Sequence, residues 1–153
     1  MAKPNYFHRG LVVGKFSPLH RGHELLIQRA FQMCREVVLI SYSKPEFPGC
    51  EAERREQWLA DLFPQAIRLV ANEQRLRDWF SDRDLTMPSN EDRDRLHRRF
   101  TGFLCLKKLG LTVDAVFTSE DYGDGFAAEL TQYFREHDPN APAVQHILVD
   151  RGR

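Results

Sequence analysis

Residues 14–27, GKFSPLHRGHELLI, join a short apolar run to an amphipathic one. The run that leads into this stretch, Gly10–Phe16, is typical of a strand, and Ser17-Pro18 would end it. From position 22 to position 34, apolar residues recur every three or four positions, which is the spacing of a helix with one buried face. The stretch therefore predicts a strand, a tight loop and a helix in succession.

The same alternation continues along the chain. Residues 36–43, EVVLISYS, are apolar on both faces, as a strand inside a parallel sheet requires. Further strands are expected at 67–71, 114–119 and 144–149, and helices at 55–62, from Ser89 to Gly110, and at 126–137. Residues 72–90 have no clear period and are predicted to form a loop-rich insertion. The pattern predicts one α/β domain over residues 1–153, a Rossmann-like, doubly wound, parallel five-stranded sheet with helices on both faces.

Composition and charge exclude several function classes. The 22 Lys and Arg residues balance the 22 Asp and Glu residues, so no overall field favours nucleic acid or an anionic membrane. The longest apolar runs are too short to span a bilayer, and the N-terminus lacks the apolar core of a signal peptide. The three cysteines form no CxxC pair, which argues against a disulfide framework or a zinc knuckle. We expect a cytoplasmic protein with small-molecule partners.

The predicted loop and helix start suit an anion. A helix that begins near Gly22 directs unpaired N–H groups and the positive end of its dipole toward the loop, so phosphate is the natural ligand. His20 and His23 flank this glycine and can add imidazole N–H donors, and Lys15 adds a positive charge from the end of the strand. Orientation and charge neutralisation supply most of the acceleration in phosphoryl chemistry, so these groups are fit for it.

Other interpretations compete for the two histidines. An isolated HxxH spacing is most often a pair of incidental surface residues at a turn. The spacing also suits metal ligands, but no third His, Cys or carboxylate lies at a supporting distance in the sequence, so no metal site is predicted. The Walker A order GxxxxGK[ST] and the GxGxxG order are both missing.

Three segments carry a resemblance to a known family. GKFSPLHRGHELLI resembles the HxGH signature of the nucleotidyltransferase superfamily. VFTSEDYGDGFAAEL (116–130) and ILVDRGR (147–153) look like the later segments of bacterial nicotinamide-nucleotide adenylyltransferases of the bifunctional, regulator-associated type. The resemblance implies the nucleotidylyl transferase fold and transfer of AMP from ATP to a phosphorylated small molecule, first of all nicotinamide mononucleotide, which would give NAD and pyrophosphate.

The resemblance also implies roles for individual residues. His20 and His23 would hold the α- and β-phosphates, and Lys15 would steady the reacting phosphates. The predicted nucleotide-binding residues are Gly14, Phe16, Ser17, Gly22, Ser119, Glu120, Tyr122, Asp150 and Arg153. Arg55 and Trp79 are candidates for binding the acceptor, although a solvated helix face for the first and a structural role for the second explain them equally well. Mg²⁺ is expected to bind together with the nucleoside triphosphate.

The sequence departs from this family in two ways. The family continues into an S-x-T-x-x-R motif that grips the β- and γ-phosphates, whereas this sequence stops at Arg153. Relatives that use nicotinamide mononucleotide carry a tryptophan where residues 89–100 here read SNEDRDRLHRRF. The departures leave open a cytidylyltransferase that uses CTP, a non-catalytic nucleotide sensor, and a C-terminal domain fused in a longer chain. A homo-oligomer is left open as well.

The remaining polar residues have ordinary interpretations. The run 91–99 carries charges of both signs, which is typical of a surface helix rather than a nucleic-acid patch. Asp124 is expected to cap a helix. His97, His137 and His146 have no partner nearby in the sequence and are assigned no function.

Overall fold

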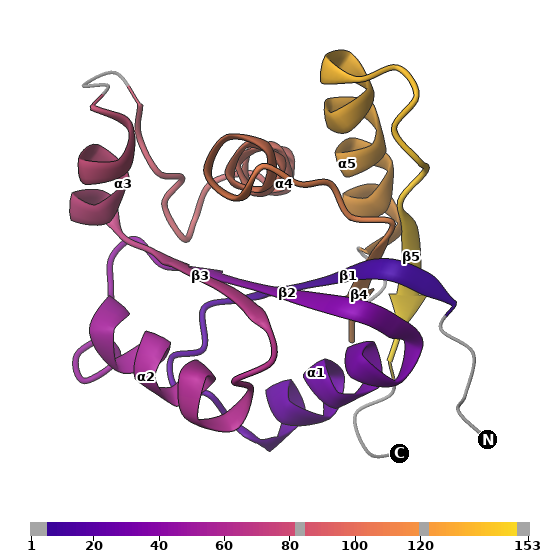
Figure 1. Cartoon of the computed structure of the whole chain (residues 1–153). Coiled ribbons are helices and arrows are strands. Elements are labelled where there is room, and N and C mark those ends of the chain that lie inside the picture. Colours follow the sequence, from indigo (N-terminus) through magenta and orange to yellow (C-terminus); the bar gives the residue numbers. More distant parts are fainter. Residues whose placement is uncertain (1–5, 82–84, 120–122, 150–153) are drawn as a thin grey trace.

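A parallel five-stranded sheet forms the centre of the protein (Figure 1). The structure, a computed structural model, describes residues 6–81, 85–119 and 123–149. The strands lie in the order β3-β2-β1-β4-β5, with bounds Phe7–Gly14 for β1, Cys34–Tyr42 for β2, Ile67–Ala71 for β3, Ala115–Thr118 for β4 and Gln145–Leu148 for β5. All four pairings are parallel. The predicted Rossmann-like, doubly wound α/β fold is therefore confirmed.

Helices cover both faces of this sheet, as Figure 1 shows. The helices are α1 (Arg21–Met33), α2 (Ala52–Leu62), α3 (Glu73–Phe80), α4 (Asp94–Phe103) and α5 (Gly123–His137), and the π-helical segment η1 (Leu104–Leu109) continues α4. One face of the sheet packs against α1 and α2, and the other packs against α3, α4 and α5. None of the helices in the described ranges is long and apolar enough to cross a bilayer.

The sequence of β1 explains why the sheet is buried on both faces. Neighbouring side chains on a strand point to opposite faces, so Leu11 joins the core beneath α4 and α5 while Val12 joins the core beneath α1. Both side chains are 0% exposed. The continuous apolar run of β2 is divided in the same way, with Val38 on one face and Leu39 on the other. A strand with two buried faces needs such a run.

The strand order places a topological switch at β1. The chain proceeds from β1 to β2 and β3 on one side, and then returns across the sheet to β4 and β5 on the other side. In open sheets of this kind ligands bind beyond the carboxyl ends of the strands, where the order reverses. In this protein that position is the crevice between the carboxyl ends of β1 and β4, and Gly14 and Lys15 border it.

The predicted loop-rich insertion at 72–90 is wrong for residues 73–80, which form α3. Asn72 caps this helix, because its side-chain oxygen accepts a hydrogen bond from the backbone N–H of Arg75 at 2.8 Å. Leu76 is the only buried residue of α3. A helix of eight residues with one buried side chain gives almost no apolar period, which is why the sequence pattern did not indicate it.

The helix predicted from Ser89 to Gly110 is present, but its start is different. Ser89 donates its backbone N–H to the Asp92 carboxylate at 2.7 Å, and the N–H of Asp92 returns to the carbonyl of Ser89 at 3.0 Å. These two bonds close a turn ahead of the helix, which begins at Asp94. Gly110 ends η1 in the left-handed conformation, with φ 68°, as the pattern predicted. The other predicted elements are present, with ends shifted by a few residues.

Candidate functional site

Two histidines cap the amino end of α1. His20 is the N-cap residue, in an extended conformation with φ −133° and ψ 175°. Its Nδ1 accepts a hydrogen bond from the backbone N–H of Gly22 at 3.1 Å, and Nδ1 of His23 accepts one from the N–H of His20 at 3.2 Å. The arrangement is a capping box in which imidazoles replace the usual Ser or Thr and Glu or Gln. The first turn of the helix is thus stabilised by the two residues that the sequence analysis assigned to phosphate.

These capping bonds determine which ring nitrogen carries the proton. Because Nδ1 of each imidazole accepts a hydrogen bond, each ring in its neutral form carries its proton on Nε2. The two rings are stacked, with centroids 3.7 Å apart and planes 22° from parallel. The stack keeps the rings of His20 and His23 side by side at the helix start, where the positive end of the helix dipole already favours an anion.

Phe16 supports His23 from the interior. Its side chain is 1% exposed and belongs to the core beneath α1. The ring meets the His23 imidazole edge to face, with centroids 4.9 Å apart. It also lies over Gly14, where an added Cβ would come within 2.7 Å of the Phe16 ring. Nucleotide binding by Gly14 and Phe16 stays a prediction.

The backbone of Lys15 is held in place while its side chain is exposed. Its carbonyl accepts hydrogen bonds from the hydroxyls of Ser17, at 3.1 Å, and Ser41, at 3.0 Å. The Ser41 hydroxyl in turn accepts a bond of 2.7 Å from Nη1 of Arg55. A buried chain of contacts therefore runs from α2 through β2 to the carboxyl end of β1.

Arg55 is a buried structural residue in this arrangement. Its side chain is 0% exposed, so the interpretation as part of a solvated helix face is wrong. Besides Ser41, the guanidinium donates to the carbonyl of Cys50 at 2.9 Å and to the Glu46 carboxylate at 2.8 Å, with a longer contact of 3.5 Å to the carbonyl of Ala71. These contacts are all internal. Acceptor binding by Arg55 stays a prediction that nothing in this geometry favours.

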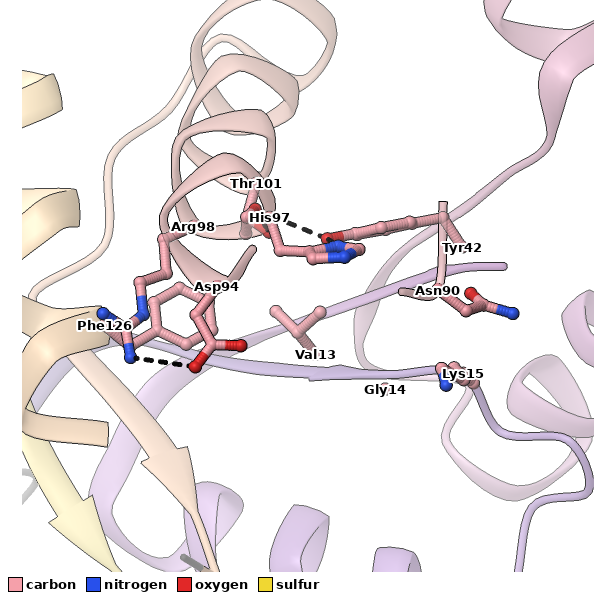
Figure 2. Close-up of a pocket in the computed structure, with 10 residues that line it drawn as sticks. All are labelled: Val13, Gly14, Lys15, Tyr42, Asn90, Asp94, His97, Arg98, Thr101 and Phe126. Atoms are coloured by element: carbon pink, nitrogen blue, oxygen red, sulfur yellow. Dashed lines mark hydrogen bonds and ion pairs between the residues drawn. The ribbon is translucent and has the colours of Figure 1, made fainter. Parts of the chain in front are cut away.

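A cavity of about 290 Å³ opens at the carboxyl ends of β1 and β2 (Figure 2). Residues of the strands form its floor, and the first turns of α4 form its opposite wall. It is lined by Val13, Gly14, Lys15, Tyr42, Asn90, Asp94, His97, Arg98, Thr101 and Phe126. Lys15 therefore links this cavity to the histidine-capped helix start.

Tyr42 and His97 form one side of the cavity. The Tyr42 hydroxyl lies 2.8 Å from Nδ1 of His97, and the two ring planes are 17° from parallel. Phe100 packs edge-on against Tyr42, with centroids 5.0 Å apart. Burial raises the pKa of Tyr42, so the hydroxyl stays protonated at neutral pH. His97, which has no partner nearby in the sequence, thus has a close partner in the fold and lines the cavity.

Asp94 and Arg98 stand at the other side of the cavity (Figure 2). Their charged groups are 3.8 Å apart, with the Asp94 side chain 76% exposed and that of Arg98 17% exposed. The Arg98 guanidinium packs on the first turn of α5, where a Cβ added to Gly125 would lie 2.6 Å from Nη1. The predicted surface helix at 91–99 is present from Asp94 onward, with residues 94–96 exposed and residues 97–99 half-buried.

Asn90 shapes the cavity wall by joining two loops. Its side-chain N–H groups donate to the hydroxyl of Ser43 at 3.1 Å and to the carbonyl of Pro45 at 3.2 Å, and its side-chain oxygen accepts from the N–H of Lys44 at 3.1 Å. The backbone N–H of Asn90 also donates to the carbonyl of Lys44 at 2.8 Å. The segment after β2 is thereby fixed beside the start of α4.

Trp79 does not line the cavity. It lies on α3, half-buried against the core, and the ammonium of Lys108 stands 4.8 Å from its ring centroid. Lys108 belongs to η1, which continues α4 beyond its far end. The contacts of Trp79 support the structural interpretation, and acceptor binding stays a prediction.

Of the other predicted site residues, some lie within the part of the chain that the structure describes and others lie outside it. Ser17 donates to Lys15, and Gly22 donates its N–H to His20, so both lie in the histidine loop. Ser119 follows the carboxyl end of β4 and is half-buried. Glu120, Tyr122, Asp150 and Arg153 lie outside the described residues. Over residues 6–81, 85–119 and 123–149, the structure contains no group of three or more His, Cys, Asp or Glu side chains that could hold a metal ion.

Comparison with known proteins adds information about the fold. No protein-family model and no curated protein matches the chain. The chain is similar to the lipopolysaccharide core biosynthesis protein from Thermoplasma volcanium GSS1, at 12% identity and a TM-score of 0.57, covering 96% of this chain and 99% of that one. It is also similar to NadR protein in complex with NAD and AMP-PNP, at 21% identity and a TM-score of 0.52, covering 96% of this chain and 38% of that one.

A third solved structure is also similar to the chain in its fold. It is a bifunctional NMN adenylyltransferase/ADP ribose pyrophosphatase from Francisella tularensis, at 17% identity and a TM-score of 0.54, covering 96% of this chain and 39% of that one. The chain thus spans about two fifths of the length of the last two proteins. At these identities the likeness concerns the fold, and the chain has the Rossmann-like α/β fold of these proteins.

Proposed function

We propose that the protein is a nucleotidyltransferase that transfers AMP from ATP to a phosphorylated small molecule, with nicotinamide mononucleotide as the first acceptor to test. The observation that carries this proposal is the pair of capping histidines, His20 and His23, at a helix start beside the switch point of the sheet. The shared fold with NadR and with an NMN adenylyltransferase supports the reaction class.

The proposed reaction needs charge stabilisation more than proton transfer. An oxygen of the acceptor phosphate, already anionic, attacks the α-phosphorus of ATP. The bond between the α-phosphorus and the bridging oxygen breaks, and pyrophosphate leaves with the electron pair. His20 and His23 would donate Nε2–H groups to the phosphate oxygens, where the negative charge changes during transfer, and the amino end of α1 would add its dipole. Lys15 would neutralise further charge from the end of β1.

Magnesium would accompany the triphosphate in this reaction. Mg²⁺ in such sites is held largely by substrate phosphates and water, with one or two carboxylates from the protein. The ion would supply charge neutralisation on the phosphates.

The acceptor would occupy the cavity beside Lys15. Three of the residues that line it, Lys15, His97 and Arg98, offer nitrogen donors suited to an anionic molecule, while Asp94 offers a carboxylate at the opening. This assignment replaces Arg55 and Trp79 as the first residues to test for acceptor binding.

Release of pyrophosphate from ATP or CTP across a panel of phosphorylated acceptors tests the reaction. His20→Asn is the informative variant, because asparagine is among the best N-cap residues but lacks the Nε2–H donor. We expect His20→Asn to lower turnover by roughly a hundredfold, as for the loss of one preorganised donor. Wild-type turnover in this variant would contradict the proposed role of His20.

His20→Ala is the matched comparison. It removes the cap as well as the donor, which should lower the free energy of unfolding by about 1 kcal/mol and Tm by about 2–4 °C relative to His20→Asn. Both variants should show the same loss of turnover relative to the wild type. Binding of ATP by the wild type without pyrophosphate release, across the whole panel, would reject transfer and leave a nucleotide-binding protein.

A further inference from the structure

His146, the second residue of β5, connects this strand to the carboxyl end of β4 and to the start of α5. Its Nε2 lies 2.6 Å from the hydroxyl of Thr118 at the end of β4. Its Nδ1 lies 3.0 Å from the carboxylate of Asp124 in the first turn of α5. The imidazole itself comes from β5 and its side chain is 7% exposed, whereas the Asp124 side chain is 92% exposed. Both ring nitrogens are therefore occupied by groups of two other elements.

The ring also packs flat on the start of α5. A Cβ placed on Gly123 would overlap the His146 imidazole, so the residue at that position has to be glycine for the ring to lie there. Gly123 is buried. The close contact and the two hydrogen bonds hold the first turn of α5 at a fixed position relative to the end of β4 and the start of β5.

The location of this contact is important for a ligand at the switch point. β4 is the neighbour of β1, and the crevice between their carboxyl ends is the place where ligands bind in sheets of this order. The triphosphate is proposed to lie at His20 and His23 and the acceptor in the cavity beneath α4. Thr118 and the start of α5 lie on the remaining side of this position, where the nucleoside part of ATP would bind.

We infer that His146 is a positioning residue for the nucleoside triphosphate: through Thr118 and Asp124 it fixes the edge of the crevice against which the nucleoside binds. Thr118 directly precedes Ser119, a predicted nucleotide-binding residue, and Asp124 lies in the first turn of α5. Because Thr118 and the first turn of α5 are already held in place by these contacts, they lose less conformational freedom when the ligand arrives, which strengthens binding. This inference rests on the proposed function.

Isothermal calorimetry with ATP and Mg²⁺, without acceptor, tests it on the folded protein. We expect His146→Ala to raise Kd for ATP roughly tenfold, as for the loss of one or two hydrogen bonds that order the site. Thr118→Val and Asp124→Ala each remove one of the two bonds, so each should raise Kd by a smaller factor. Combined with His146→Ala, neither should add its full effect, because the same contact is already lost.

Thr131→Val is the matched control. Thr131 also joins α5 to the segment before β5, donating to the carbonyl of Ala127 at 2.8 Å and accepting from the N–H of Val144 at 2.9 Å, but this link lies about two helical turns beyond the start of α5. Thr131→Val should lower Tm and leave Kd for ATP unchanged, whereas the three variants around His146 should raise Kd. When transfer activity is measured, the variants at His146, Thr118 and Asp124 should raise KM for ATP more than they lower kcat.

The outcomes separate the two hypotheses. An unchanged Kd in all three variants, with wild-type binding of ATP, overturns the role of His146 and leaves the proposed function intact. Equal effects of Thr131→Val and Thr118→Val on Kd also overturn it, because they would reflect general destabilisation. ATP binding by the wild type without pyrophosphate release rejects the transfer reaction, while the calorimetric test of His146 still applies. A wild type that binds neither ATP nor CTP rejects both.

Discussion

Replacement of Arg55 gives the sharpest test of the interior of the site. Arg55→Met keeps most of the apolar stem and removes the guanidinium, which donates hydrogen bonds of 2.9 Å or shorter to Cys50, Ser41 and Glu46. Removing one partner of a buried, hydrogen-bonded ion pair usually costs about 3–5 kcal/mol. Glu46 is 25% exposed and keeps a bond of 3.2 Å from Asn72, so its charge is not stranded. We therefore expect a loss near the lower end, about 3 kcal/mol.

Thermal and urea unfolding measure this loss. For a chain of this size, about 3 kcal/mol corresponds to a fall in Tm of roughly 6–12 °C. The adjacent Arg54 is exposed and provides the control, since Arg54→Met should change the free energy of unfolding by no more than about 0.5 kcal/mol. Equal effects of the two substitutions, or a stable Arg55→Met protein with impaired acceptor binding, would refute the structural role of Arg55 derived from these contacts.

Two further predictions concern the packing around buried groups. Gly123→Ala should destabilise the protein by about 1–3 kcal/mol through overlap with the His146 ring, and urea unfolding should show that the added cost largely disappears in the His146→Ala background. Burial raises the pKa of Cys34 and Cys105 to about 12, whereas Cys50 is half-buried, so a thiol reagent at pH 8 should modify one thiol in the native chain and all three after unfolding. Because unfolded thiols titrate near 9 and the buried ones near 12, the unfolded chain releases these protons first, and the free energy of unfolding should fall as the pH rises from 9 to 12.

The fold was predictable because most of its signals are local. The apolar run of residues 36–43 and the glycine at position 110 each indicate a strand or a helix end without knowledge of distant residues. α3 was missed because one buried leucine sets no period, although Asn72 was available as a capping signal. The positions of strands and helices along the chain could therefore be predicted wherever buried residues recur with a regular period.

The site was predictable only in part, because its cavity combines residues that are distant in sequence. His97 pairs with Tyr42 across 55 positions, and His146 reaches Thr118 across 28. A single sequence contains no signal that indicates which distant residues will be in contact. Arg54 and Arg55 are adjacent and chemically identical, and only the direction of each side chain from α2 makes one exposed and the other fully buried.

The connection that returns the chain from β3 to β4 supplies one part of the candidate site, and the start of α1 supplies the other. Five of the residues around the cavity, Asn90, Asp94, His97, Arg98 and Thr101, come from this single crossover, while the capping histidines belong to the helix on the opposite face of the sheet. In terms of the proposed function, the crossover can vary in sequence, and with it the choice of acceptor, without disturbing the groups proposed to bind the phosphates. Exchanging residues 89–101 as one unit between proteins of this fold is accordingly the natural route to a new substrate preference.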